Sequence, residues 1–162
     1  MIAIKAATLP RFYGTIHPRS GENLPVPTQA PVQQARTPDT PYYRLGGAPV
    51  FEAICNRFYD LMEQDPQYAE LRAMHAPDLG FMRKALPQFL AGWAGGPRDW
   101  FAANPDRCMM SVHKPFVIDR ATAGQWAEAM KRAIADVAPQ PADMAEAMGE
   151  VLAELARNMA RA

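Results

Sequence analysis

Four side chains combine a chemically active tip with an apolar sequence neighbourhood. His113 lies in the run CMMSVHKPFVI at residues 108–118, in a chain that has only three histidines. Tyr59, His75 and Trp126 each bring a hydrogen-bonding group to an apolar stretch or to a loop beside one. Buried polar tips of this kind need partners, and a ligand bound among the helices could supply them. By itself, His113 could be a metal ligand, a base or, most simply, a hydrogen-bonded core residue.

The sequence offers His113 no second metal ligand at a recognisable spacing, and this limits the kind of metal that it could bind. A single histidine cannot complete a zinc site, and no cysteine or acid stands at a recognisable zinc-ligand spacing. Haem iron needs only one protein ligand, because the porphyrin supplies four nitrogens. If His113 binds a metal, haem is therefore the centre that fits. Phosphate loops, HExxH, CxxC and GxSxG are all missing, which argues against a hydrolase or phosphotransferase.

Two amphipathic patterns lie in the first half of the chain and would help to position these residues. Between residues 48 and 64, an apolar face at helical spacing places Tyr59 at its edge. A second stripe runs from residue 77 or 78 to 94 and contains Met82, Leu86, Phe89 and Trp93. Pro87 lies inside this stripe and predicts a kink or a helix restart. Gly95, Gly96 and Pro97 then end the helix.

The second half of the chain predicts two more helices. One begins after Asp119 or Thr122, either of which can cap it, and carries Trp126 and Met130 on its apolar face. The last, about residues 142–160, turns inward a stripe that includes Val151. Residues 98–117, which contain His113, have little periodicity. No segment alternates as a strand should, so the sequence predicts an all-α fold with four substantial helices.

Composition limits the partners and the domain organisation. Seventeen basic residues balance seventeen acidic ones, which gives no reason to expect nucleic acid or an anionic membrane as partner. No apolar run is long enough to span a membrane and no signal peptide is evident. Cys55 and Cys108 are interpreted as buried free thiols, so we expect a cytoplasmic protein. Residues 1–40 read as a proline-rich, flexible arm and 41–162 as the folded domain.

An ordered set of short motifs resembles group II of the truncated haemoglobins. The matching pieces extend from about Tyr42 to Ala160 and are YYRLGG (42–47), NRFYDLM (56–62), LRAMHAPDL (71–79), FLAGWAGGP (89–97), HKPFVI (113–118) and QWAEAM (125–130). The resemblance implies a truncated globin, a two-over-two helical sandwich around haem b (iron protoporphyrin IX). It also implies that His113 is the proximal iron ligand.

The resemblance further assigns the distal side of the haem. Tyr59, His75 and Trp126 match the positions whose side chains donate hydrogen bonds to the ligand, His75 doing so in a suitable tautomer. We expect the cofactor to contact Met82, Leu86, Phe89, Phe116, Trp126 and Met130. Two departures stand out: Val112 where many members have arginine, and Ala85 where a basic residue often holds a haem propionate. Replacements for the propionate contact could come from Arg83, Lys84, Arg107 or Lys114.

The expected function is reversible binding of dioxygen, and of NO and CO, at a five-coordinate iron. Three donors around the ligand should slow its escape, which suits oxygen binding, sensing or redox detoxification. Oxidation of nitric oxide or peroxide chemistry would need an electron donor, an unidentified reductase. A homodimer is compatible with the sequence. Two alternatives remain: a haem-free helical binding or signalling module using the same apolar groove, and an interaction protein working through residues 1–40.

Overall fold

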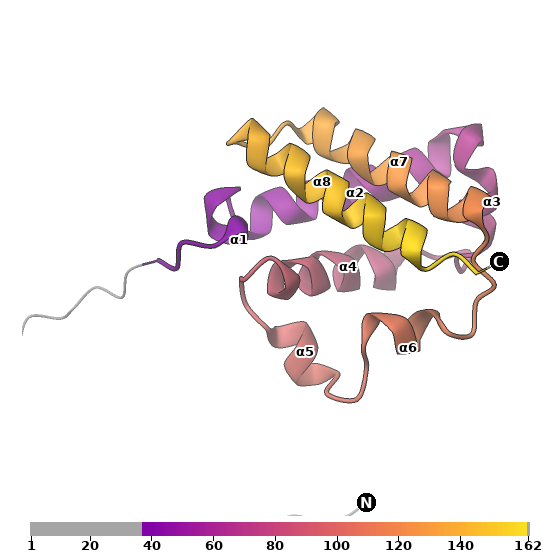
Figure 1. Cartoon of the computed structure of the whole chain (residues 1–162), viewed down its shortest axis with the longest axis horizontal. Helices are drawn as coiled ribbons and strands as arrows, with labels where there is room; N and C mark the ends of the chain where they lie inside the picture. Colours follow the sequence, from indigo (N-terminus) through magenta and orange to yellow (C-terminus); the bar gives the residue numbers. More distant parts are fainter. Residues whose placement is uncertain (1–36, 162) are drawn as a thin grey trace, which may run out of the picture. The chain divides into compact units, whose positions relative to one another are not determined.

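The amphipathic stripes of the sequence form the four longest helices of the structure. The structure is a computed structural model that describes residues 37–161, which contain no strand, and the predicted all-α class is confirmed. The arm predicted at residues 1–40 lies almost wholly outside the described residues. Figure 1 shows the helices α1 (Pro41–Arg44), α2 (Ala48–Gln64), α3 (Ala69–Ala73), α4 (Gly80–Trp93), α5 (Asp99–Ala103), α6 (Met109–His113), α7 (Arg120–Val137) and α8 (Ala142–Asn158).

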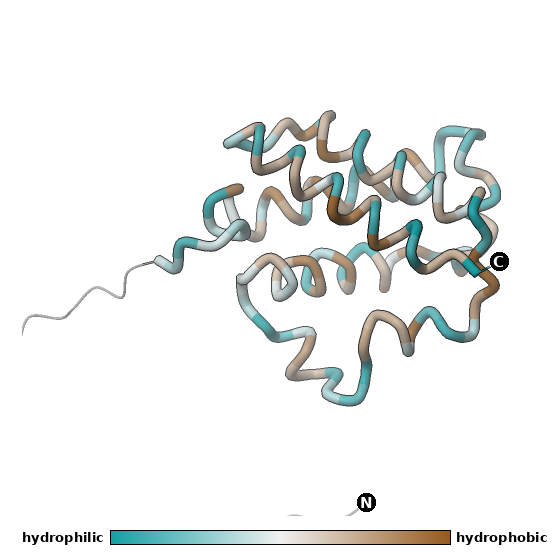
Figure 2. The backbone as a smooth tube through the Cα atoms, viewed as in Figure 1, coloured by the Kyte–Doolittle hydropathy of each residue, from teal (hydrophilic) through white to brown (hydrophobic). Residues whose placement is uncertain are grey.

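The long helices pack as two pairs. α2 contacts both α4 and α7, and α8 lies along α7 (Figure 1). Hydrophobic and hydrophilic residues alternate along α7 and α8, as expected of amphipathic helices (Figure 2). The resulting pairs, α2 with α4 and α7 with α8, are the two-over-two arrangement predicted from the sequence. None of the described helices is both long and apolar enough to cross a membrane.

The helix α2 supplies the centre of the core. Phe51, Ile54, Cys55 and Phe58 are all at most 1% exposed, as their spacing predicted. Full burial of an aromatic or branched side chain contributes about 1.5–3 kcal/mol each, so this single face supplies a large share of the hydrophobic stabilisation. The buried face continues through Tyr59, which the sequence had placed at its edge. The side chain is therefore held by packing as tightly as its apolar neighbours.

The contact between α1 and the end of α4 requires a glycine. The amide of Tyr42 donates to the carbonyl of Ala94 at 3.0 Å, which brings the tyrosine ring over Gly96. A Cβ at Gly96 would lie 2.5 Å from carbons of that ring, closer than packed atoms can approach. A residue with a Cβ at position 96 would therefore push the Tyr42 ring away from the end of α4.

The helices α7 and α4 each contain a local sequence signal, a capping aspartate in one and an internal proline in the other. Asp119 caps α7, since its carboxylate accepts from the Thr122 amide at 2.8 Å and from the Thr122 hydroxyl at 2.9 Å. The helix α4 continues through Pro87 and does not restart there. Proline removes only its own amide donor, which would have bonded to the Arg83 carbonyl, and the remaining ladder sustains the helix.

Three residues predicted to lie inward are exposed, and the first of them, Trp93 at the end of α4, is 37% exposed. Val151 is 46% exposed, because the buried face of α8 consists of Met148 and Leu152 together with the small residues Ala145, Gly149 and Ala153. A Cβ at Gly149 would lie only 3.3 Å from the Ile134 side chain of α7, so the two helices approach closely there. Cys108 is also exposed, whereas Cys55 is buried as predicted.

Candidate haem site

His113 is the last residue of the short helix α6, and its ring is held in one orientation. Its Nδ1 lies 2.7 Å from the carbonyl oxygen of Met109, one helical turn earlier. A carbonyl can only accept, so Nδ1 carries the proton in this hydrogen bond and the neutral ring keeps a lone pair on Nε2. Metal-binding histidines in proteins are typically fixed by such a second hydrogen bond. The half-buried side chain therefore fits the role of an iron ligand.

The helix that carries His113 was not predicted, and its start is fixed by a polar pair. The Cys108 thiol sulfur accepts from the Ser111 amide at 3.3 Å, and the Ser111 hydroxyl bonds to the Cys108 amide at 2.9 Å. This reciprocal cap explains why Cys108 points outward. Hydrogen bonds from Ser111 lower the pKa of the Cys108 thiol. After the helix, the Phe116 amide bonds to the His113 carbonyl, and the Phe116 side chain is 44% exposed.

Tyr59 lies on α2 and is only 1% exposed. Its ring packs edge-on against Phe58, with centroids 5.0 Å apart, and the Arg83 guanidinium carbon lies 5.6 Å from its centre. Burial raises the pKa of the Tyr59 hydroxyl far above its ordinary value. The hydroxyl consequently keeps its proton at all physiological pH values and is a hydrogen-bond donor.

Aromatic contacts connect Tyr59 to the other two predicted distal residues. The Phe58 ring lies 5.4 Å from that of Trp126 on α7, so one phenylalanine touches both Tyr59 and Trp126. The His75 ring lies 6.2 Å from the Tyr59 ring in an edge-to-face arrangement. The structure therefore brings Tyr59, His75 and Trp126 into one region, although they come from different helices and loops.

His75 follows α3, which is attached to α7 by the side chain of Gln125. The amide of Leu71 donates to Gln125 Oε1 at 2.9 Å, and Gln125 Nε2 donates to Glu70 at 3.2 Å. The Leu71 carbonyl lies 2.9 Å from His75 Nδ1. As in His113, the proton must reside on Nδ1, so neutral His75 offers an acceptor at Nε2. This tautomer is not the one that the predicted donor role requires.

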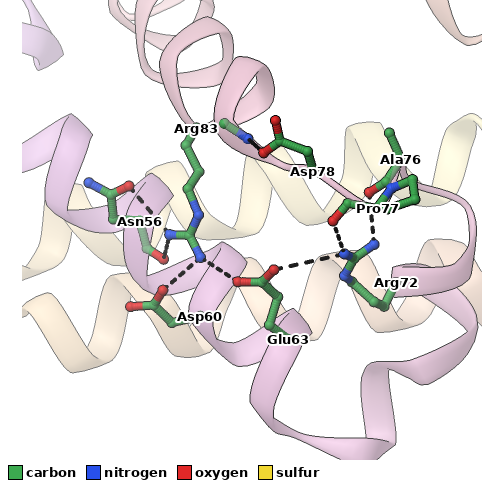
Figure 3. A network of polar contacts seen from close by, with 9 residues as sticks. Asn56, Asp60, Glu63, Arg72, Ala76, Pro77, Asp78 and Arg83 are labelled. Carbon is green, nitrogen blue, oxygen red and sulfur yellow. Dashed lines mark hydrogen bonds and ion pairs between the residues drawn. The ribbon is translucent and has the colours of Figure 1, made fainter.

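Polar contacts fix the loop that carries His75 and also occupy Arg83 (Figure 3). The Arg72 guanidinium donates to the carbonyls of Ala76 and Pro77 at 3.0 and 2.7 Å and lies 3.8 Å from Glu63. Arg83 binds the same Glu63 at 2.8 Å, together with other groups of α2, Asp60 and Asn56. Arg83 is thus engaged with α2, and the exposed candidates for a propionate contact are Lys84, Arg107 and Lys114.

The remaining predicted contact residues lie on α4 and α7. Met82, Leu86 and Phe89 are half-buried and pack against the core, and Met130 is fully buried. Phe89 also joins an aromatic cluster that the sequence did not reveal, with its ring 5.1 Å from Trp100 and 5.5 Å from Phe101 of α5. Contacts between one helix and a short helix that follows it have no periodic signal in the sequence. The predicted contacts of Met82, Leu86, Phe89 and Met130 with haem stay predictions.

Among residues 37–161, no three histidine, cysteine, aspartate or glutamate side chains gather as a metal cluster. A metal held by His113 would therefore need ligands from a prosthetic group, which is the situation of haem iron. The His113 lone pair, the half-buried apolar residues of α4 and the protonated Tyr59 are groups of the kind that such a prosthetic group requires. This agreement comes from the side chains that are present and from their hydrogen bonds.

Comparison with known proteins decides the family. The bacterial-like globin profile matches residues 40–161, most of the chain. The chain belongs to the bacterial-like globin family. It is 33% identical to a cold-adapted truncated haemoglobin from the Antarctic bacterium Pseudoalteromonas haloplanktis, with a TM-score of 0.71 over 76% of this chain and 98% of that one. The resemblance to truncated haemoglobins is therefore confirmed, and this globin is a haem-binding protein for diatomic gases.

Two group II proteins are among the similar structures. The 2-on-2 haemoglobin of Agrobacterium tumefaciens is 26% identical and has a TM-score of 0.72, covering 79% of this globin and 98% of that chain. The group II truncated haemoglobin of Bacillus anthracis is also 26% identical, with a TM-score of 0.68 over 76% of this globin and 98% of that chain. These matches support the two-over-two fold and the group II resemblance.

Proposed function

We propose that this globin is a cytoplasmic haem b protein that binds dioxygen reversibly, with His113 as the iron ligand and Tyr59 and Trp126 retaining the gas. The observation that carries the proposal is the hydrogen bond from His113 Nδ1 to the Met109 carbonyl, which leaves the Nε2 lone pair available to iron. Ferrous haem supplies a coordination position at which dioxygen, nitric oxide or carbon monoxide binds. The cytoplasmic location is supported by two cysteines that form no disulfide.

Tyr59 and Trp126 stabilise the gas ligand by donating hydrogen bonds to its outer atom, where negative charge accumulates. Tyr59 is suited to this role because burial keeps its hydroxyl protonated and packing fixes its ring. The indole N–H of Trp126 can only donate. Both donors are already oriented by Phe58, so little ordering accompanies ligand binding. This preorganisation favours slow release, and hence storage, sensing or redox detoxification with a separate reductase.

The apolar residues Met82, Leu86, Phe89, Phe116 and Met130 line the proposed haem site and limit access of water. Exclusion of water strengthens each hydrogen bond to the gas, because competing donors are removed. Lys84, Arg107 and Lys114 are the basic side chains available to the propionates at the exposed edge.

The proposal is tested by absorption spectra of the purified full chain after addition of haem. Spectra of the reduced protein should change when dioxygen or carbon monoxide is added. His113→Ala should lose haem or give a different spectrum, whereas His75→Ala, a matched histidine variant, should still bind haem. Failure of the wild-type protein to take up haem would favour the haem-free binding module.

A further inference from the structure

A cavity lies where the start of α7 meets the end of α8, close to the C-terminus (Figure 1). It has a volume of about 450 Å³, and its lining includes Arg120 and Gly124 of α7 and Arg157 and Asn158 of α8. Cavities of roughly 300–1,000 Å³ are the size that holds small organic molecules in proteins. No residue assigned to haem or to the gas lines this cavity, so the proposed function leaves it without a use.

The two arginines of the cavity differ from other basic residues of the same helices in having no acidic partner. Lys131 of α7, for example, forms an ion pair with Glu150 of α8. In the part of the chain that the structure describes, no carboxylate is close enough to Arg120 or Arg157 to form an ion pair. Both side chains are exposed, and their positive charges are therefore available to an anion.

Hydrogen bonds hold the walls of the cavity in place. The amide of Arg161 donates to the carbonyl of Ile118 at 2.9 Å, which ties the segment after α8 to the segment before α7. The acid next to Arg120 in sequence is Asp119, and its carboxylate accepts from the Thr122 amide and hydroxyl at 2.8 and 2.9 Å. This carboxylate is thus already bonded within the first turn of its own helix.

Gly124 leaves space beside the backbone of α7. A Cβ built at this position would meet no atom within 4 Å, so no contact in the described structure requires a glycine here. Glycine inside a helix is less favourable than alanine, and the residue therefore lowers the stability of α7. A molecule that approaches the helix closely at this point would explain the absence of a side chain.

We propose that this cavity binds a small organic phosphate monoester, whose phosphate is held by Arg120 and Arg157 and accepts a further hydrogen bond from the side-chain amide of Asn158. Arginine presents parallel N–H donors that match the oxygens of a phosphate. A phosphate monoester carries a charge of about −1.5 to −2 at pH 7, which two guanidinium groups balance. The space beside Gly124 takes the organic part. Binding of the ester needs neither haem nor gas, so the inference does not rest on the proposed function.

A phosphate held by both arginines connects the start of α7 with the end of α8. These two segments are brought together only in the folded chain, so the ester binds the folded state and stabilises it by mass action. The melting temperature of the full chain should therefore rise as the concentration of the ester rises. The same concentrations of an uncharged alcohol, ethanol, should not raise it.

The test is calorimetric titration of the purified full chain with ethyl phosphate, beside ethyl sulfate as a monoanion of similar shape. Ethyl phosphate should bind at millimolar concentration, and ethyl sulfate should bind more weakly because its charge is smaller. Arg120→Gln and Arg157→Gln should each weaken the binding of ethyl phosphate roughly 5- to 10-fold, since the lost hydrogen bonds are charged but reached by solvent. Arg98→Gln is the matched control, because Arg98 is exposed and lies outside the cavity lining, and it should leave the affinity unchanged.

A second variant tests the position of the ligand without removing a basic residue. Gly124→Glu adds a carboxylate where a Cβ meets no neighbour, so the helix should form and the binding of ethyl phosphate should be lost. Circular dichroism of the variant checks that α7 is intact. Nuclear magnetic resonance of the wild-type chain should show the Gly124 amide and the Asn158 side-chain amide shifting as ethyl phosphate is added.

Four results would overturn the phosphate site. No binding of ethyl phosphate at millimolar concentration would remove it. Equal weakening by Arg98→Gln and the two cavity variants would show a general attraction to positive charge, and unchanged binding in Gly124→Glu would place the ester elsewhere. Binding to phosphatidylcholine vesicles that contain phosphatidic acid, without binding of ethyl phosphate, would make a lipid headgroup the partner. None of these results involves a haem spectrum, so each is separate from a failure of the proposed function.

Discussion

Replacing Tyr59 by phenylalanine should release dioxygen faster while preserving the fold. The ring contacts Phe58 edge-on and lies beside the Arg83 guanidinium, and a phenylalanine ring keeps both contacts. Only the hydroxyl is removed, and burial ensures that this hydroxyl is protonated in the wild-type protein. The variant therefore isolates one donor from the shape of the site.

The size of the effect follows from the kind of hydrogen bond that is lost. A bond to a charged acceptor contributes about 1.5–3 kcal/mol, and about 1.4 kcal/mol corresponds to a factor of ten. Dioxygen should therefore dissociate roughly 10- to 150-fold faster from Tyr59→Phe. Carbon monoxide, which gains less charge on its outer atom, should respond much less.

The assay is stopped-flow displacement of dioxygen by carbon monoxide from the reduced, haem-loaded protein. Tyr68→Phe is the matched control, since Tyr68 is also 1% exposed but lies in the 3-10 turn Pro66–Tyr68. That control should leave the dissociation rate unchanged. A change of less than about two-fold in Tyr59→Phe, with haem binding intact, would refute the donor role of Tyr59.

Other perturbations probe the elements that hold the site. Gly96→Ala should destabilise the fold by about 1–3 kcal/mol in urea unfolding, because its Cβ would lie 2.5 Å from the Tyr42 ring; Gly124→Ala, with no neighbour within 4 Å, should be neutral or stabilising. Cys108→Ala removes the cap of the helix that carries the proposed iron ligand and should speed haem transfer to a scavenger apoprotein, while Cys108→Ser should not. Asp119→Ala should lower the melting temperature at neutral pH. Hydrogen bonds from the first turn of α7 lower the pKa of Asp119. The stabilisation by the cap is therefore complete above the pKa of an unfolded aspartate, about 3.9, and is lost as pH falls through the folded value. Equal melting temperatures of variant and wild type at pH 7 would contradict the capping role.

The long helices could be predicted because their stabilising contacts repeat along the sequence. Each apolar stripe recurs at the period of a helix, and the cap at Asp119 is a local signal. The buried face of α8 was placed less well, because hydrophobicity favours Val151 over the alanines and Gly149 that pack against α7. Close helix approach depends on the partner helix, and a single stripe does not contain that information.

The site was predicted only in part for a similar reason. The residues His113, Tyr59, His75 and Trp126 follow from motifs, but the packing of Tyr59 against His75 and of Phe58 against Trp126 depends on tertiary structure. The short helix α6 has too few residues for a periodic pattern, and the tautomer of His75 depends on where the Leu71 carbonyl points. The attachment of Arg83 to acids of α2 likewise joins charges far apart in sequence.

The central claim, that His113 is the iron ligand, is tested most directly by resonance Raman spectroscopy of the reduced, haem-loaded protein with nitrogen-15 histidine. The iron–histidine stretching band should shift to lower frequency with the heavier isotope. It should disappear in His113→Gly, return when imidazole is added, and persist in His75→Leu. A band that survives unchanged in His113→Gly, or that is lost in His75→Leu, would contradict the assignment of the proximal ligand.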